Sequence, residues 1–142
     1  MHKFSENYKP TYGDMSTALG AESSPAADTI ETDTYVDMRD YDSLVVYGIA
    51  SAVASDAVLT LTIWEGTDTT GAASATTTQT DTFTSGATSE TDVLQAEIRG
   101  EQLSSGFRYA GAKLVSDDDS DTAIVTLLML QGRARFGSSS LP

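Results

Sequence analysis

The feature that most constrains the fold of this chain is a series of short apolar runs, each about as long as one β-strand. From Asp28 onward these runs are rich in Thr, Val, Ile and Tyr, and clusters of Gly, Ser and Asp separate them. Such a pattern is typical of strands joined by turns. It predicts strands over residues 29–37, 43–52, 57–65, 76–84, 92–99, 107–116 and 122–136. We therefore expect an all-β domain over residues 28–142, a β-sandwich or jelly-roll-like barrel of about seven to eight antiparallel strands.

Two of the predicted strands are apolar on both faces. In residues 43–52 and 122–136, apolar side chains occupy positions of both parities, among them Tyr47, Leu127 and Met129. An antiparallel sheet with one face in water alternates apolar and polar residues, so both faces of these strands must be covered. A subunit interface would cover them, and so would a central position beneath loops and the N-terminal segment.

Residues 1–27 differ from the rest and predict an extended N-terminal arm. Its large apolar residues are Phe4, Tyr8, Tyr12, Met15 and Leu19. Their spacing imitates a helix face, but prolines and glycines interrupt it. Burying them would contribute about 1.5–3 kcal/mol each, whereas ordering some twenty residues costs roughly 1–2 kcal/mol apiece. The arm is therefore expected to order through backbone pairing or on a partner; the alternative is a disordered leader.

The charge of the chain excludes two classes of partner. The formal net charge is −13, and the chain has no cysteine. A surface of this sign repels nucleic-acid phosphates and anionic membranes. No stretch approaches the roughly 20 apolar residues of a membrane helix, and the N-terminal residues do not have the apolar region of a secretory signal. We expect a soluble protein whose partners are neither nucleic acid nor membrane.

The sequence carries no recognisable catalytic motif. Its one histidine, His2, lies in the predicted arm, where nothing would hold the imidazole as a catalytic base. Neither a GxSxG elbow nor a glycine-rich phosphate loop occurs. We expect a protein that is not an enzyme and uses no cofactor. A hydrolase built on a carboxylate pair stays an alternative, because such a pair is defined in space rather than in sequence.

One acidic cluster is a candidate calcium site. Asp117, Asp119 and Asp121 lie in a short segment between two predicted strands. Hard cations prefer oxygen-rich loops of this kind. The segment lacks the glycine and the later glutamate of an EF-hand loop, and aspartate is also common in tight turns for conformational reasons.

Several short motifs resemble those of bacteriophage capsid decoration proteins, also called cement or auxiliary head proteins. They are residues 7–14 (NYKPTYGD), 41–48 (YDSLVVYG), 106–109 (GFRY) and 132–136 (GRARF). The resemblance implies a structural virion protein, assembled in the host cytoplasm and bound to the capsid exterior. It also implies a homotrimer whose arms reach a neighbouring subunit or the major capsid protein, and it brings no catalytic residues.

The leading interpretation is thus a subunit-bridging protein that stabilises a shell. The residues expected to contact partner subunits are Phe4, Tyr8, Tyr12, Met15, Leu19, Tyr47, Leu127 and Met129. The alternative from another class is a carbohydrate-binding or adhesin-like β-sandwich module, for example on a phage tail or head fibre. In that module Trp64 or Tyr109 would form a stacking platform and the acidic turn would hold calcium.

Overall fold

The computed structural model describes residues 8–12, 17–19, 29–32, 34–71, 73–87, 89–117 and 123–134, with the backbone alone for 8–12, 17–19, 133 and 134. The elements are β1 (Tyr8–Tyr12), β2 (Thr17–Leu19), β3 (Thr29–Glu31), β4 (Val36–Asp37), β5 (Tyr41–Val53), β6 (Val58–Gly66), β7 (Ser74–Thr84), β8 (Glu90–Arg99), the short 3-10 helix η1 (Gly100–Gln102), β9 (Tyr109–Ser116) and β10 (Ala123–Ala134). No helix in these ranges is long and apolar enough to cross a membrane.

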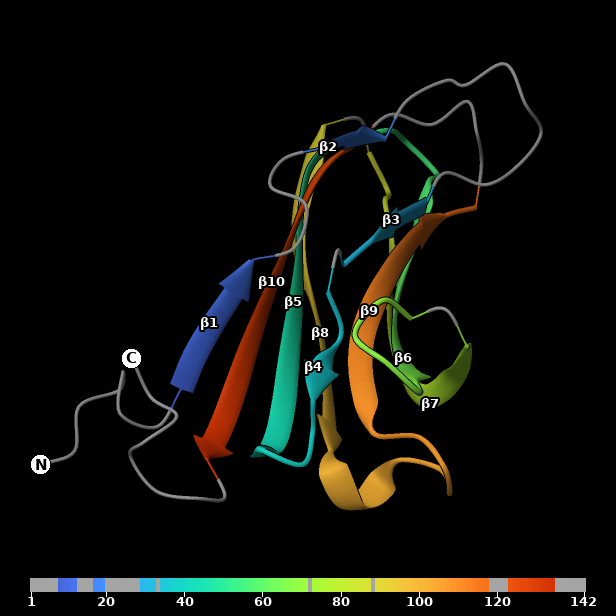
Figure 1. The fold of residues 1–142 in the computed structure, drawn as a ribbon. Coiled ribbons are helices and arrows are strands. Elements are labelled where there is room, and N and C mark those ends of the chain that lie inside the picture. Colours follow the sequence, from blue (N-terminus) through green and yellow to red (C-terminus); the bar gives the residue numbers. More distant parts are fainter. Residues whose placement is uncertain are drawn as a thin grey trace, which may run out of the picture.

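The strands form two antiparallel sheets that pack face to face (Figure 1). The first sheet has the order β1-β10-β5-β8, with β2 also paired to β10; the second has the order β3-β9-β6-β7, with β4 also paired to β9. When β1 and β2 are counted as one broken strand, and β3 and β4 as another, the two sheets read 1-8-3-6 and 2-7-4-5 in sequence order. This is the strand order of a jelly roll. The predicted all-β sandwich or jelly-roll architecture is confirmed.

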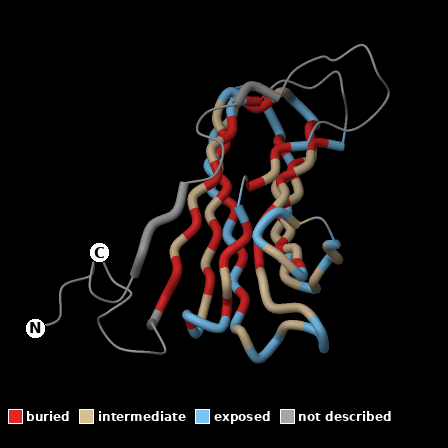
Figure 2. The backbone as a smooth tube through the Cα atoms, in the orientation of Figure 1, coloured by how far each residue is buried: buried red, intermediate tan, exposed pale blue. Residues whose placement is uncertain are grey.

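The core lies between the two sheets and follows the two-residue period of the strands (Figure 2). In β6, Leu59, Leu61 and Ile63 point inward and are fully buried, while the residues between them are only half-buried. In β8 the inward residues are Leu94, Ala96 and Ile98. Each large apolar side chain buried in this way contributes about 1.5–3 kcal/mol, so the alternation decides which face of each strand joins the core.

The phase of β10 corrects one expectation. Val125, Leu127 and Met129 point into the core and have no exposed surface. The sequence had suggested that Leu127 and Met129 contact a partner subunit. The second sheet covers both side chains instead, so neither has exposed surface left for a partner. The outward residues of β10 belong to the other parity and include Leu128 and Leu130. Both sets are apolar, so the sequence pattern did not reveal the phase.

The predicted strand over residues 29–37 is interrupted by a plug formed by Tyr35. This side chain is 1% exposed and lies against Gly66, Gly71 and Gly111, where a Cβ atom would come within 2.5 to 2.9 Å of the ring. The Tyr35 hydroxyl donates to Glu31 Oε1 at 3.0 Å. Burial, together with this carboxylate, raises the pKa of Tyr35 above its usual range. The plug fixes the turn between β6 and β7 on the second sheet and leaves β3 and β4 as short edge strands.

Parts of the predicted arm form the edge of the first sheet. β1 pairs with β10 from Tyr8–Gly132 to Tyr12–Leu128, and β2 pairs with the start of β10, with Leu19 opposite Ala123. These pairs supply the backbone hydrogen bonds that the sequence argument required, because burial of the apolar side chains alone does not offset the entropy cost of ordering the segment. The division of the chain at residue 27 stays a prediction.

Candidate interaction face

The outward side of the first sheet is apolar over β5 and β10 and continues onto β8 at Val93. We call it the outward apolar face; its members are Val45, Tyr47, Ile49, Val93, Ile124, Leu128 and Leu130. Three of them are the most exposed large apolar residues of the described chain: Ile49 at 41%, Val93 at 52% and Ile124 at 45%. Single exposed apolar residues are ordinary, whereas a contiguous group is typical of an interaction surface.

The strand register makes these residues contiguous. Leu128 pairs with Tyr47, and Leu130 pairs with Val45. On the other side of β5, Ile49 pairs with Val93. In an antiparallel pair, directly opposite side chains lie about 4.5–5.5 Å apart. Apolar pairs therefore join β10 to β5 and join β5 to β8 at Val93, although no apolar row crosses all three strands. On β8, Gln95 and Glu97 lie opposite Tyr47 and Val45.

The same face carries almost no charge in a chain with a formal net charge of −13. Residues 43–51 of β5 and 124–132 of β10 include no Asp, Glu, Lys or Arg. The charged residues at its rim are Glu97 and Arg99 on β8, which pair with Val45 and Ser43. Depletion of charge at the centre, with polar groups at the rim, is the composition of protein–protein interfaces.

The outward side of the second sheet is polar along β7. On β7, Thr76, Thr78, Thr80, Thr82 and Thr84 are all exposed. They continue onto β6, where the hydroxyl oxygens of Thr62 and Thr80 lie 3.3 Å apart in a hydrogen bond. Covering these hydroxyl groups would bury little apolar area, so the hydrophobic effect gives a partner little driving force to bind there.

The two rings expected to form a sugar platform also lie on the second sheet, and each carries a cation on one face. Lys113 Nζ lies 4.1 Å from the centroid of the Trp64 ring and 3.0 Å from Glu31 Oε2. The Arg108 guanidinium lies 4.9 Å from the centroid of the Tyr109 ring. Cation–π contacts of this kind occupy the ring face, so a sugar stacking there would have to displace a bound cation.

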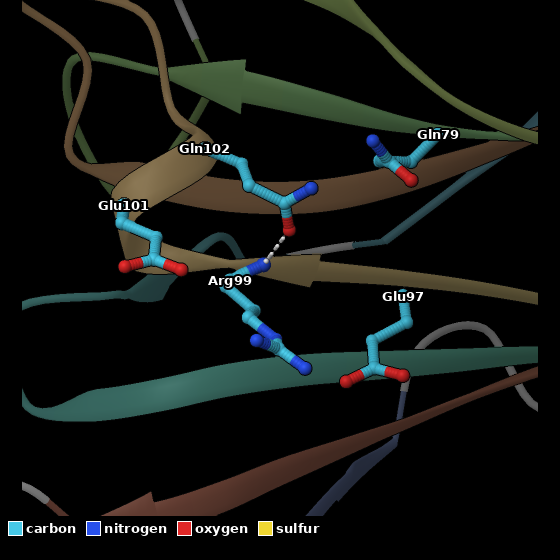
Figure 3. A pocket seen from close by; sticks show the side chains of 5 residues that line it. All are labelled: Gln79, Glu97, Arg99, Glu101 and Gln102. Carbon is cyan, nitrogen blue, oxygen red and sulfur yellow. Dashed lines mark hydrogen bonds between the residues drawn. The ribbon is translucent and has the colours of Figure 1, made fainter.

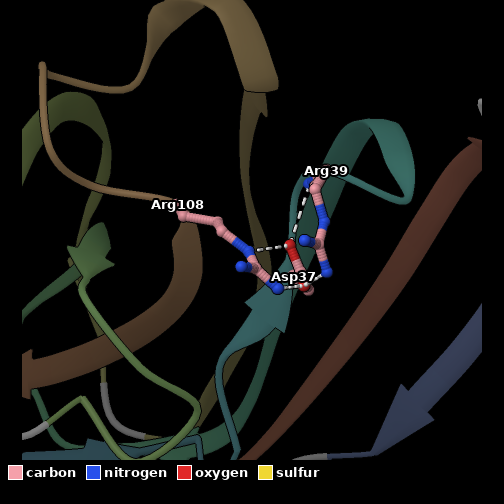
Figure 4. Close-up of polar contacts among 3 residues, drawn as sticks. All are labelled: Asp37, Arg39 and Arg108. Atoms are coloured by element: carbon pink, nitrogen blue, oxygen red, sulfur yellow. Dashed lines mark hydrogen bonds and ion pairs between the residues drawn. The ribbon is translucent and has the colours of Figure 1, made fainter.

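Arg108 also belongs to an ion cluster that fixes the edge of the second sheet (Figure 4). Its Nε donates to Asp37 Oδ1 at 2.8 Å, and its Nη2 contacts Asp37 Oδ2. Arg39 adds a backbone bond to Oδ1 at 3.0 Å and a side-chain bond to Oδ2 at 3.2 Å. The hydrogen bond from Arg108 is the main cause that lowers the pKa of Asp37 below its usual value. Because one carboxylate holds both guanidinium groups, the cluster ties β4 to the segment before β9.

A polar pocket lies at the rim of the outward apolar face, between the neighbouring edges of β7 and β8 (Figure 3). It has a volume of about 360 Å³ and is lined by Gln79 of β7, Glu97 and Arg99 of β8, and Glu101 and Gln102 of η1. The turn after η1 is held in place by the buried Glu65, whose Oε2 accepts a bond from the Ser104 N–H at 2.8 Å. The pocket thus has fixed walls on two strands and a helix.

Two side chains close the backbone edge of β8 beside this pocket. Asp81 Oδ2 accepts a bond from the Gln95 N–H at 2.9 Å, and Gln102 Oε1 accepts one from the Arg99 N–H at 2.7 Å. An edge strand whose N–H groups are occupied in this way does not pair readily with another strand. Partners are therefore expected to meet the sheet on its face rather than along β8.

The candidate calcium site is described only in part. Asp117 Oδ1 accepts a bond from the Val58 N–H at 2.8 Å, and the Asp117 N–H donates to the Val58 carbonyl at 3.0 Å. Asp119 and Asp121 lie outside the described residues. Within the described ranges, no three His, Cys, Asp or Glu residues are grouped so that they could hold a metal ion.

Of the residues expected to contact partners, Tyr47 lies on the outward apolar face. Tyr8, Tyr12 and Leu19 belong to strands paired with β10, and Phe4 and Met15 lie outside the described residues. The other members of the face were missed as contact residues. Their signal was the clear alternation of β8, because its register with β5 fixes the phase of β5, and the register of β5 with β10 then fixes the phase of β10.

Comparison with known proteins defines no family for this chain. No protein-family model matches the sequence, and no curated protein matches it significantly. Among solved structures, the chain is similar to one of infectious bursal disease virus Gt strain, with 16% identity and a TM-score of 0.49 over 88% of this chain and 33% of that one. It thus spans about a third of that viral chain.

Two further structures are similar over most of both chains. One is the top component of cowpea mosaic virus, described as naturally occurring empty particles, with 9% identity, a TM-score of 0.40, and coverage of 93% of this chain and 95% of that one. The other is TmCBM61 in complex with β-1,4-galactotriose, with 12% identity, a TM-score of 0.43, and coverage of 89% and 88%. Similarity this low carries no argument about function, and the jelly-roll assignment depends on the strand order alone.

Proposed function

We propose that this chain is a structural protein that binds other protein subunits through its outward apolar face. In its specific form, the proposal is a bacteriophage capsid decoration protein that binds the major capsid protein as a homotrimer on the outside of the virion. The proposal includes no catalytic role. The observation that carries it is the group of neighbouring apolar residues on the outward side of β5 and β10, which Val93 of β8 extends and of which Ile49, Val93 and Ile124 are exposed.

The position of this face supports a protein partner. Burial of apolar area is the main driving force of association, at roughly 25 cal/mol per Å². Because the face lies at the centre of a sheet, a partner can pack against it without unfolding anything. The N–H groups of Gln95 and Arg99 are already bonded at the β8 edge, so face-to-face packing is favoured over strand addition.

The size of the face supports an assembly with several contacts. The area of the face follows from the spacing of its strands. Three strands about 4.8 Å apart, each about nine residues long with a rise of about 3.3 Å per residue, cover roughly 400 Å². A standard stable interface needs about 800 Å² per partner. One such contact is therefore weak alone, and a trimer that engages several sites at once gains effective concentration. This agrees with the trimer implied by the sequence resemblance.

The test is the solution mass of the full chain, measured by light scattering after size exclusion, followed by co-sedimentation with undecorated shells of the parent phage. We expect an oligomer that binds shells, and we expect Ile49→Asp and Val93→Asp to abolish shell binding. Thr78→Asp, which adds the same charge on the exposed side of β7, is the matched control and should keep both properties. If the Asp variants at Ile49 and Val93 bind shells as the wild type does, the face is not the contact surface.

A further inference from the structure

We propose that the pocket between β7 and β8 is a second binding site, which takes a neutral polyhydroxylated ligand such as one unit of a saccharide. This goes beyond the subunit-binding role and uses different residues from the outward apolar face. It also differs from a stacking platform on Trp64 or Tyr109, because neither ring lines the pocket and each carries a cation on one face.

The first argument is the charge of the lining. Glu97 and Glu101 offer only acceptors when ionised, whereas Arg99 offers only donors. A cationic ligand would meet Arg99 as a like charge, and an anionic ligand would meet the two carboxylates. A neutral ligand meets neither conflict.

The second argument is the mixture of donors and acceptors. Gln79 and Gln102 each combine an amide group that has two donor hydrogens with a carbonyl acceptor. Gln79 Nε2 already donates to Thr78 Oγ1 at 3.3 Å, and Gln102 Oε1 already accepts from the Arg99 N–H, so each side chain keeps part of its capacity for a ligand. A hydroxyl group is one donor and two acceptors at once. A ligand that carries several hydroxyls can therefore use the carboxylates, the guanidinium and the amides together, which neither an ion nor an apolar molecule can do.

The backbone of β8 adds one more donor to this pocket. The Gln95 and Arg99 N–H groups both point away from β5, because each is bonded to a side chain at the edge. Antiparallel pairs alternate, so the Glu97 N–H, midway between them, points to the same edge. Its neighbours are closed by Asp81 and Gln102, which leaves space for a small molecule but not for a strand.

The size of the pocket limits the ligand. A volume of about 360 Å³ lies near the lower end of the roughly 300–1,000 Å³ typical of ligand sites. The site is open and no aromatic ring lines it, so we expect affinity in the millimolar range and recognition of a single unit within a longer glycan.

The experiment is an NMR titration of the full-length protein, following the side-chain amides of Gln79 and Gln102 and the Arg99 Nε–H. The probes are glucose, galactose, mannose, xylose and N-acetylglucosamine, each also as a short oligomer. Arginine amide serves as the cationic arm and citrate as the anionic arm. We expect at least one neutral sugar to shift these signals saturably, and Arg99→Ala and Gln79→Ala to weaken it at least tenfold. Arg39→Ala, which removes an exposed guanidinium elsewhere, should leave it unchanged.

Four results would overturn the proposal. They are saturation by arginine amide or citrate in place of the sugars, no saturable shift with any probe, shifts confined to Trp64 and Tyr109, and hydrolysis of an oligomer that Glu97→Gln abolishes. The last would make the pocket an active site. The solution mass and shell binding are measured without sugar, so failure here leaves the subunit-binding proposal standing, and the reverse is also true.

Discussion

The two outward sides of the sandwich differ in composition although both belong to antiparallel sheets. The first sheet carries the outward apolar face, in which Tyr47 lies opposite Leu128 and residues 43–51 and 124–132 include no charged side chain. Around Thr62 and Thr80, the second sheet presents hydroxyl groups, two of which bond to each other. The inward residues of β5, β6, β8, β9 and β10 form one shared apolar core.

The difference teaches that the core alone does not explain the composition of β5 and β10. One apolar parity is enough to build the core of an antiparallel sandwich, as β6 demonstrates with Thr60 and Thr62 on its outward side. The second apolar parity of β5 and β10 lies outside the core: Ile49 and Ile124 are exposed, and the other large apolar residues are only half-buried. A partner that covers the first sheet gives it a physical reason.

The largest expected effect is a difference in stability between substitutions at inward and at outward positions of β10. Leu127→Ala removes a fully buried side chain and should lower the free energy of unfolding by about 2–5 kcal/mol. Leu128→Ala, one position along, should cost the free monomer less than about 1 kcal/mol. Urea denaturation of both variants measures this. Equal losses would mean that the outward face is already covered within a single molecule, and the comparison would fail.

This pair also marks what the sequence can predict. The strands over residues 43–52, 57–65, 76–84, 92–99, 107–116 and 122–136 follow from local composition, and β5 to β10 confirm them. The phase of β10 does not follow, because apolar residues fill both parities and a shift by one residue exchanges the faces. It is decided by the register with β5, which joins residues about 80 positions apart in the chain.

A second prediction concerns the lock on the second sheet. A Cβ at Gly111 would lie 2.5 Å from the ring of Tyr35 and 2.8 Å from Thr32 Oγ1, so Gly111→Ala should destabilise the fold by about 1–3 kcal/mol through overpacking. Gly86→Ala is the control, since its nearest atom is Glu90 Oε1 at 4.0 Å, and it should change stability little. Thermal unfolding compares them; a neutral Gly111→Ala would show that the Tyr35 plug does not hold this side rigid.

A third prediction uses the ion cluster at the edge of the second sheet. The pKa of Asp37 is lowered in the folded protein, chiefly by Arg108, so its stabilising effect is present above the unfolded pKa of about 3.9 and is lost as the pH falls through the folded value. Asp37→Asn should therefore be less stable than the wild type at pH 7, and the gap should narrow below about pH 4. Denaturation series at several pH values measure the gap. A gap that stays constant down to pH 2 would contradict the role of the carboxylate charge.

The polar pocket could not be predicted from the sequence either, and the reason differs from that for the phase of β10. Its residues come from three elements, and Gln79, Glu97 and Gln102 are ordinary polar residues with no motif spacing. Only the jelly-roll connection brings the edge of β7 beside that of β8. The sequence could have suggested Glu97 and Arg99 as the charged rim of an otherwise uncharged face, but not the partners opposite them.

The smallest expected effect on stability concerns the closed edge of β8. Asp81→Ala removes the acceptor of the Gln95 N–H bond, 2.9 Å long in the wild type, and water can replace it, so the cost should be about 0.5–1.5 kcal/mol. The freed N–H lies on an edge strand, and such edges pair with other chains. We therefore expect slow, concentration-dependent aggregation with a β-sheet infrared signature, absent from Thr78→Ala. If Asp81→Ala stays as soluble as that control over days, closure of the edge is not what directs partners to the face, and the contrast between the two sides would depend on apolar area alone.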